Sequence, residues 1–314
     1  MSKSAIPPAV VGIEGALDYQ AFKVRSKCND EKDQDRVEVK DAPAALFATV
    51  CDGATQSMRS AEAAEIISNN PAELWVDGAL TERVEVLRMR RDELLASEPS
   101  EPVDETSFLS RAFAQIVRDK QRHSFQTTLV SVRITPRATG HVLLEAKTCG
   151  DSALLVFDRR GRLVLSSPLL DDESSPFGHV SPLTEVLPDH FRGEAPSHTE
   201  EIDDDAHIVL CSDGFYDAFP NPGALFRWLL QNGANPDPAL GELHAQLDRH
   251  RGDDDISYVW LFPLAIHTPA PEPPRVPPDT GGSGRLLPTV AALLRRFADW
   301  IARDAATVSG GMAS

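Results

Sequence analysis

The stretch HIVLCSDGFYDAF, residues 207–219, predicts a buried strand that ends in an aspartate and a glycine. Four apolar residues, IVLC, are followed by SDG and then by a further apolar pattern. The same ending occurs in ALFATVCDGAT, residues 45–55, where CDG follows the apolar run LFATV. Solubility does not require an acid at the end of a buried strand. The two endings, at Asp52 and Asp213, therefore predict one shared site.

Length, composition and charge predict a globular protein that does not bind nucleic acid. The chain has 314 residues, of which 41% are hydrophobic, enough for one large core or two modest ones. Its formal net charge of −17 repels nucleic-acid phosphates. The N-terminal MSKSAIPPAV lacks the basic start and apolar stretch of a signal peptide, and no run reaches the roughly 18 apolar residues of a membrane span.

The cysteines predict free thiols in a reducing compartment. The 4 cysteines are widely spaced and form no CxxC pair, which disfavours a disulfide framework or a zinc site. We therefore expect a cytoplasmic protein.

The hydrophobic periodicity predicts an α+β fold, with helices packed on the faces of antiparallel sheets. In the first half we expect strands at 22–25, 36–39 and 45–51, and helices from a cap at Ser60, over 72–95 and over 108–122. A series of strands that we expect to form an antiparallel meander covers 127–134, 141–149, 153–158 and 162–167. Residues 168–201 predict a loop-rich insertion, followed by a strand at 207–213, helices at 223–231 and 238–249, and a last strand at 255–262.

The composition changes after Phe262. The segment PAPEPPRVPPDTGGSG predicts a linker that is extended where it is proline-rich and flexible where it is glycine-rich. Beyond it, apolar residues at spacings of three and four predict a basic amphipathic helix. We therefore expect a main domain at 1–264, a linker at 265–284 and a helical tail at 285–314. This helix could cover its own domain, bind a partner protein or, with less support, contact an anionic membrane surface.

Acids gather at the ends of the expected strands: Asp52, Asp213, Asp254 with Asp255, and the early cluster NDEKDQDR. If these strands are neighbours, the carboxylates meet at one edge of the sheets. Two carboxylates about 4 Å apart repel by roughly 4 kcal/mol at an effective dielectric constant of about 20, and several such pairs would exceed the stability of a typical domain. A divalent cation resolves this conflict, and an all-oxygen set favours Mg²⁺ or Mn²⁺ over zinc.

The ordered motifs resemble those of the metal-dependent type-2C Ser/Thr protein phosphatases, in their bacterial-type form. That family has an acid ending N-E/Q-D, DG after a strand, GTT, GDS, SDG with a downstream Asp, and DN before the last strand. The corresponding segments here are DQD (33–35), DG (52–53), QTT (126–128), GDS (150–152), SDGFYD (212–217) and DDIS (254–257). Each motif is weakly specific alone, but the full set in order over about residues 20–262 is a strong signal. The resemblance implies a sandwich of two antiparallel β-sheets flanked by α-helices.

The resemblance also implies a binuclear centre of Mn²⁺ or Mg²⁺. Its ligands by position would be Asp35, Asp52, the Gly53 carbonyl, Asp213 and Asp254, with Asp151 and Asp213 holding a weaker third metal. The glycine after each strand-end aspartate is expected to let the backbone turn sharply.

The early motif has two possible registers. Aligning DQD makes Asp35 the ligand and places a strand directly after it, as in the family, but leaves no arginine five residues upstream. A register from Arg25 to Asp30 recovers that arginine and makes Asp30 the ligand. We prefer Asp35, and in either register Arg25 is the candidate phosphate-binding residue.

The activity implied is hydrolysis of phosphoserine or phosphothreonine on proteins, by direct attack of a metal-activated water. The resemblance makes Asp35, Asp52, Asp213 and Asp254 the catalytic acids, and implies a phosphoprotein substrate and a paired Ser/Thr kinase. Two alternatives are a catalytically weak phosphatase-like binding or regulatory module and a phosphatase for a small phosphorylated metabolite.

Three positions depart from the family pattern. Ala54 stands where some members place a histidine that could act as a general acid, so that role is unfilled. Gln126 replaces the glycine of GTT, which we interpret as a structural change. Asp255 replaces the usual asparagine beside the last ligand.

Overall fold

The computed structural model describes residues 9–12, 19–26, 33–54, 57–97, 108–137, 140–167, 186–195, 197–247 and 255–263. The chain divides into two compact units, Met1–His267 and Thr268–Ser314, and the described residues all belong to the first. The expected linker and C-terminal helix lie outside the described residues, as do Asp30 and Asp254. Within the described part, no helix is long and apolar enough to cross a membrane.

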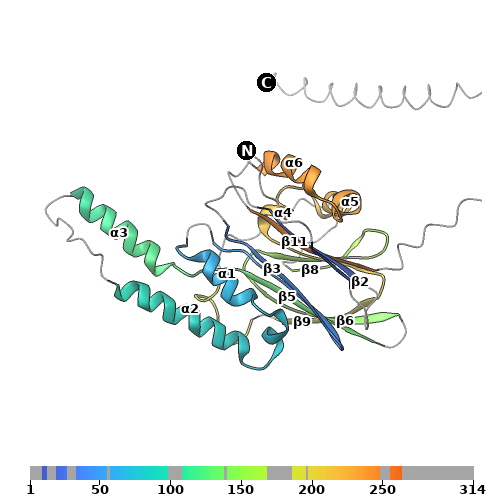
Figure 1. Ribbon diagram of the computed structural model, residues 1–314, viewed down its shortest axis with the longest axis horizontal. Helices are drawn as coiled ribbons and strands as arrows, with labels where there is room; N and C mark the ends of the chain where they lie inside the picture. Colours follow the sequence, from blue (N-terminus) through green and yellow to red (C-terminus); the bar gives the residue numbers. More distant parts are fainter. Residues whose placement is uncertain are drawn as a thin grey trace, which may run out of the picture. The chain divides into compact units, whose positions relative to one another are not determined.

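Two antiparallel sheets form a sandwich, which confirms the expected fold class (Figure 1). The six-stranded sheet consists, in spatial order, of β1 (Ala9–Gly12), β2 (Tyr19–Ser26), β11 (Ile256–Pro263), β10 (His207–Cys211), β7 (Ala153–Phe157) and β8 (Leu163–Ser167). The five-stranded sheet consists of β3 (Arg36–Ala42), β4 (Ala45–Cys51), β5 (Leu129–Pro136), β6 (His141–Cys149) and β9 (Ser197–Asp203).

The hydrophobic core lies between the two sheets. Leu46 and Val130 from one sheet and Leu154 and Leu210 from the other are fully buried in a single apolar cluster. Strand β6 shows the alternating burial of a strand with one face in the core, whereas every residue of β7, β10 and β11 is buried. The central strands of the six-stranded sheet are therefore covered on both faces.

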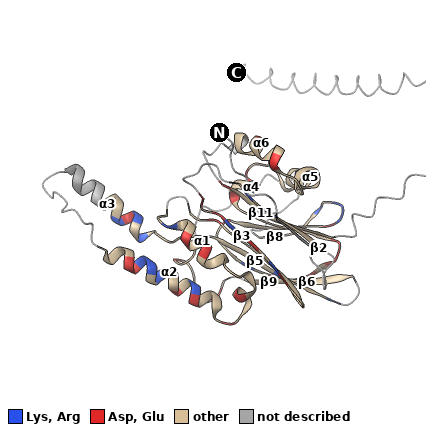
Figure 2. Cartoon of the chain, viewed as in Figure 1, with Lys and Arg blue, Asp and Glu red and all other residues tan. Residues whose placement is uncertain are grey.

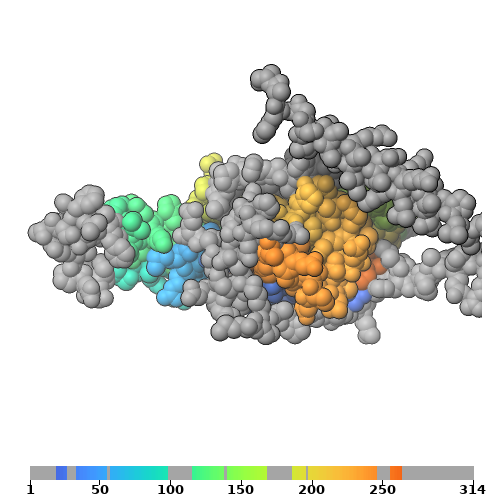
Figure 3. All heavy atoms as spheres, turned by 90° about the horizontal axis from the view of Figure 1, so that it is seen from above, coloured from blue at the N-terminus to red at the C-terminus, as the bar shows by residue number. Residues whose placement is uncertain are grey.

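Helices provide the outer cover of each sheet (Figure 1). On the five-stranded sheet lie α1 (Ser60–Ser68), the 3₁₀ helix η1 (Pro71–Trp75) and α2 (Ala79–Ala96), and α3 (Phe108–Arg122) contacts α2. On the six-stranded sheet lie α4 (Asp213–Tyr216), α5 (Pro222–Asn232) and α6 (Asp237–Leu247). In the view from above, α5 and α6 form much of the described surface over this sheet (Figure 3). Charged residues of both signs run along α2, whereas the strands are mostly uncharged (Figure 2).

The expected four-strand meander is wrong. Strands β5 and β6 form a hairpin in the five-stranded sheet, and β7 and β8 form a hairpin in the six-stranded sheet. The chain crosses between the sheets at the turn of residues 150–152. An alternating pattern is the same whichever sheet a hairpin joins, so periodicity alone could not reveal this crossing.

Three local expectations also need correction. Ser60 is not the helix cap: Arg59 occupies that position, and the Ser60 hydroxyl accepts a hydrogen bond from Gln34 Nε2 at 2.8 Å. The helix expected over 72–95 is broken, because Gly78 has a φ of 80° between η1 and α2. Strand β9 was not predicted, since all of its residues except Ile202 are exposed and it lacks an apolar alternation.

Candidate functional site

The strand ends that carry the predicted acids meet at one edge of the sandwich. The register of β3 and β4 places Asp35 and Asp52 at adjoining strand ends. The register of β10 and β11 does the same for Asp213 and Asp255. The two pairs interact across the sheets, because both Asp255 and Asp213 raise the pKa of Asp35. The strand ends place Asp35, Asp52 and Asp213 at the same edge of the sandwich, and their role as ligands stays a prediction.

Asp35 is buried among these carboxyl groups. The residue is 1% exposed, and its Oδ2 atom has no hydrogen-bond partner among the described residues. Burial, together with the charges of Asp255 and Asp213, raises the pKa of Asp35 to about 7, although polar contacts with Asp52 and Ser257 oppose the shift. A buried carboxyl group with spare acceptor capacity and negative neighbours is an environment that a cation would stabilise.

The backbone of Asp52 is held by the QTT segment. The Asp52 carbonyl accepts hydrogen bonds from Thr128 N at 2.8 Å and from Thr127 Oγ1 at 2.9 Å. The Asp52 N–H donates to Thr128 Oγ1 at 3.0 Å. These contacts fix the position from which the Asp52 side chain projects.

Gly53 is required for space rather than for an unusual backbone angle. Neither Gly53 nor Gly214 is among the described glycines with a positive φ, so neither position needs glycine for its backbone angle. A Cβ atom at Gly53 would lie 2.9 Å from the carbonyl oxygen of Gln34 and 2.9 Å from the carbonyl carbon of Ser60. No side chain therefore fits at this position unless the backbone shifts.

Asp255 has a role that the sequence interpretation missed. Its Oδ2 accepts a hydrogen bond from the backbone N–H of Gln34 at 3.0 Å, which ties the start of β11 to the segment before β3. Its charge also acts on Asp35. Its place beside Asp254, directly before a strand, put it among the strand-end acids, but its contact with Gln34 was not predicted.

Arg25 lies on β2 at the same edge of the sandwich. Its guanidinium donates to the Asp35 carbonyl at 3.1 Å and to the Asp33 carboxylate at 3.4 Å. Arg36 donates to the carbonyls of Asp33 and Asp35 at 2.9 and 2.8 Å. The two arginines therefore fix the backbone of the DQD segment, and Arg25 is bonded to that segment in this structure.

Asp151 lies in the turn that carries the chain between the sheets. The preceding Gly150 has a φ of 95°, and a Cβ atom there would lie 2.7 Å from the Thr128 side chain. The hydroxyls of Ser152 and Thr128 are 2.6 Å apart. The GDS turn thus packs directly against the segment that holds Asp52.

The described residues have the donor chemistry for a hard cation without forming a complete metal cluster. Across the described ranges, no group of three or more His, Cys, Asp or Glu residues is arranged to hold a metal ion. The predicted ligand Asp254 falls in the gap before residue 255. The donors at this edge are carboxylate and carbonyl oxygens, including the unpartnered Oδ2 of Asp35. This donor type fits Mg²⁺ or Mn²⁺.

The cysteines beside the acids are not suited to nucleophilic catalysis. Cys51 and Cys211 are fully buried, and burial raises the pKa of both thiols well above the ordinary value. Since the thiolate is the reactive form, both residues act as small apolar side chains of their strands.

The raised pKa of Asp35 makes a prediction about metal-free protein. Folded Asp35 keeps its proton up to about pH 7, whereas the unfolded residue releases it near the ordinary value of 3.8. The folded state therefore binds more protons between these values, and the free energy of unfolding should fall as the pH rises through this range. Urea unfolding of EDTA-treated protein at pH 5 and pH 8 measures this fall.

The matched controls for this pH dependence are Asp35→Asn and Asp41→Asn. In Asp35→Asn, the free energy of unfolding should fall less between pH 5 and pH 8, because this variant has no carboxyl group at the buried position. Asp41→Asn removes an exposed acid of β3, and its free energy of unfolding should fall as much as that of the wild type. An equal pH dependence in Asp35→Asn and the wild type would show that Asp35 does not titrate in this way.

The fold is an α+β sandwich of two antiparallel sheets, and comparison with protein families identifies its class. Residues 26–248 match the family described as Protein phosphatase 2C. The chain belongs to this family, which confirms the resemblance drawn from the motifs.

Solved structures show a likeness of fold at low sequence identity. A phosphatase from a pathogenic strain of Toxoplasma gondii is 11% identical, with a TM-score of 0.50, over 82% of this chain and 95% of that one. The Ser/Thr phosphatase Stp1 from Staphylococcus aureus is 15% identical, with a TM-score of 0.48, over 82% and 99% of the two chains. RsbX in complex with magnesium is 12% identical, with a TM-score of 0.41, over 81% and 98%. Comparison with curated proteins gave no match.

Proposed function

We propose that this protein hydrolyses phosphoserine and phosphothreonine on proteins with Mn²⁺ or Mg²⁺ as cofactor. The observation that carries the proposal is the environment of Asp35, a carboxyl group 1% exposed whose pKa is raised to about 7 by burial and by neighbouring carboxylates. Such clustering is unfavourable without positive charge, and it occurs in a chain of a phosphatase family.

The proposed metal ligands are Asp35, Asp52, the Gly53 carbonyl, Asp213 and Asp254, with Asp151 at a weaker third site. Bound cations would activate the water that attacks phosphorus and would neutralise charge as the serine or threonine oxygen leaves. The protein's own contribution is to hold these oxygens in place. Thr127 and Thr128 fix the Asp52 backbone, and Gln34 fixes Asp255.

Arg25 is proposed to bind the substrate phosphate. Its guanidinium already lies against the Asp35 carbonyl, at the edge that carries the acids. A guanidinium can bond a phosphate through two parallel N–H groups, so exchange of the Asp33 contact for a phosphate contact would suffice.

Hydrolysis should require added Mn²⁺ or Mg²⁺ and should be lost with EDTA. The reason is that the proposed site contains only oxygen donors and the neighbouring thiols are buried. Turnover of a chromogenic phosphomonoester, with and without chelator, measures this requirement. Alkylation of thiols in metal-saturated protein should leave the rate unchanged. Activity that survives exhaustive chelation would overturn the proposal.

The substrate class can be tested with the same preparation. A protein phosphatase should turn over phosphoserine and phosphothreonine peptides faster than small phosphorylated metabolites. The reverse order would favour a metabolite phosphatase. Metal binding without turnover of either class would favour a binding or regulatory module.

The cellular context and domain roles follow as part of the proposal. We place the activity in residues 1–264, opposed by a Ser/Thr kinase in the cytoplasm. Every motif that supports the family assignment precedes residue 264. The segment 285–314 is proposed as an accessory helix rather than as part of the catalytic site.

A further inference from the structure

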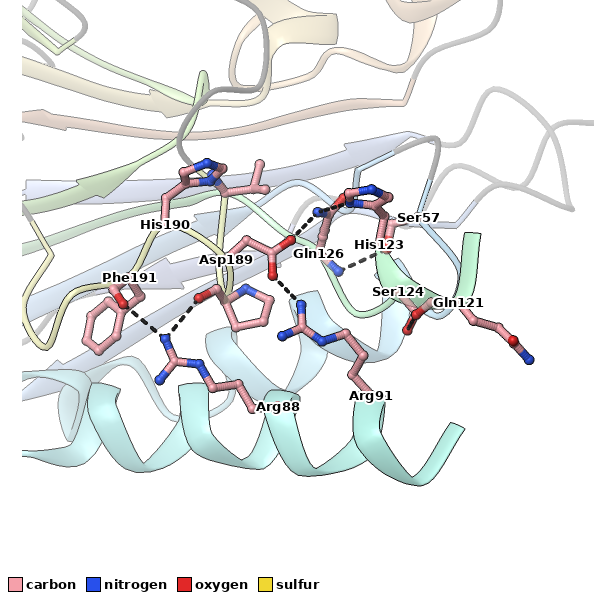
Figure 4. A network of polar contacts seen from close by, with 12 residues as sticks. Ser57, Arg88, Arg91, Gln121, His123, Ser124, Gln126, Asp189, His190 and Phe191 are labelled. Atoms are coloured by element: carbon pink, nitrogen blue, oxygen red, sulfur yellow. Dashed lines mark hydrogen bonds and ion pairs between the residues drawn. The ribbon is translucent and has the colours of Figure 1, made fainter. Parts of the chain in front are cut away.

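Gln126, which replaces the glycine of the family's GTT motif, makes a side-chain contact that glycine could not make. Its Nε2 donates a hydrogen bond to Asp189 Oδ2 at 2.6 Å. The other carboxylate oxygen of Asp189 accepts from Arg91 of α2. Figure 4 shows Asp189 between these two partners, which approach it from different parts of the chain. Gln126 therefore does more than fill the position of a glycine.

The backbone of Gln126 is bonded to the segment that follows the predicted ligand Gly53. The Gln126 carbonyl accepts a hydrogen bond from Ala54 N at 3.1 Å. The Gln126 N–H donates to Ser57 Oγ at 2.9 Å. A displacement of Gln126 would thus be transmitted to the residue next to Gly53.

The residues beside Gln126 and Asp189 run as a short paired ladder. Thr127 and Leu187 exchange backbone hydrogen bonds of 3.1 and 2.9 Å, and Thr127 also forms a bridge with Gly53. The Thr127 hydroxyl donates to the Asp52 carbonyl. The segment that contains Asp189 is therefore bonded to Thr127, which itself contacts the backbone of the proposed ligands Asp52 and Gly53.

Two arginines of helix α2, Arg88 and Arg91, bind the segment that contains Asp189. Arg88 donates to the carbonyls of Pro188 and Phe191 at 3.2 and 3.0 Å, next to the pair of Arg91 with Asp189 (Figure 4). Asp189 is exposed as a whole residue, but its side chain is only 23% exposed and that of Arg91 only 19%. A partly buried pair of this kind is screened less by water than a surface ion pair, so it can hold a defined position.

We propose that Asp189 is a positioning residue for the metal centre. It holds the Gln126 side chain against α2, and Gln126 in turn holds Ala54 and the adjoining Gly53 and Asp52. The inference rests on the proposed function, because it takes Gly53 and Asp52 as metal ligands. It predicts that the link from Arg91 through Asp189 to Gln126 affects metal affinity, although none of these three side chains is a ligand.

The experiment compares Asp189→Ala and Gln126→Met with the wild type by calorimetric titration of Mn²⁺. Each variant breaks the link without altering a proposed ligand, so Mn²⁺ affinity should fall by about tenfold, as for other residues that orient ligands. The Mn²⁺ concentration for half-maximal turnover should rise in proportion, and turnover should recover at saturating Mn²⁺. Asp189→Asn keeps one acceptor oxygen and should be intermediate. The double variant should bind Mn²⁺ no more weakly than either single variant, because both changes break the same link between Asp189 and Gln126.

A matched control is Glu145→Gln, which breaks the partly buried pair with Arg133 in the middle of the five-stranded sheet. It should leave Mn²⁺ affinity unchanged, whatever its effect on the melting temperature. Wild-type Mn²⁺ affinity in folded Gln126→Met and Asp189→Ala would overturn the inference, even if both melted at lower temperature. If only one of the two variants folds, the Mn²⁺ affinity of that variant tests the inference.

Calorimetry separates this inference from the proposed function. If the wild type binds Mn²⁺ but hydrolyses no phosphomonoester, the proposed function fails, while the affinities of the variants still decide the role of Asp189. If the wild type hydrolyses substrate and the variants bind Mn²⁺ normally, only the inference fails. If the wild type binds no Mn²⁺, both are overturned.

Discussion

Replacing Gly53 with alanine is expected to abolish metal-dependent turnover and to lower the free energy of unfolding by about 1–3 kcal/mol, the usual cost of overpacking. The new Cβ atom would lie 2.9 Å from the Gln34 carbonyl oxygen and from the Ser60 carbonyl carbon. Because these are backbone atoms, the Gly53 segment itself would have to move. That movement would displace the Gly53 carbonyl and the adjoining Asp52. Urea unfolding and turnover with saturating Mn²⁺ measure the two effects.

The matched control is Gly241→Ala in α6. A Cβ atom there would meet no heavy atom within 4 Å, and alanine favours a helix over glycine by up to about 1 kcal/mol. This variant should keep wild-type turnover and equal or greater stability. Wild-type turnover and stability in Gly53→Ala would contradict the close packing of Gly53 and would weaken its assignment as a ligand.

The sequence predicted the elements whose pattern is local and missed those defined by distant neighbours. The buried strands β4, β10 and β11 were found because their apolar runs are short and bounded by polar residues. Strand β9 was missed because it lies at the edge of its sheet and exposes nearly every residue. The assignment of the β5–β6 and β7–β8 hairpins to different sheets depends on packing, which the alternation of residues does not encode.

The candidate site likewise contains residues that local motifs predict and contacts between distant residues that they do not. The positions of Asp52 and Asp213 could be predicted, since each follows a recognisable strand, and their motifs lie in the family order. The contact of Asp255 with Gln34 joins residues 221 positions apart, and that of Asp189 with Gln126 joins residues 63 positions apart. Neither partner stands in a motif that points to the other. Only the folded arrangement brings them together.

Replacing Asp52 with asparagine is expected to reduce turnover by about 10³-fold, or about 4 kcal/mol, while the metal-free protein keeps or gains stability. The change removes one negative charge from an edge that also carries Asp213 and Asp255, so repulsion among the carboxylates in the absence of metal should decrease. An asparagine can keep the polar contact that Asp52 makes with Asp35. The backbone contacts of Asp52 with Thr127 and Thr128 do not involve its carboxylate and should persist. Turnover and thermal melts, each with and without Mn²⁺, measure the effects, and Asp41→Asn serves as an exposed control on β3.

The sign of the change in metal-free stability distinguishes a ligand from a structural acid. Removing one partner of a buried ion pair typically costs about 3–5 kcal/mol, because the other charge is left buried and unpaired. A metal ligand in a cluster of like charges should show the opposite sign without metal, and should lose the stabilisation that Mn²⁺ gives the wild type. If Asp52→Asn melts many degrees lower without metal and still turns over substrate, Asp52 supports the scaffold. The proposed metal centre would then have to be abandoned, since Asp52 is one of its proposed ligands.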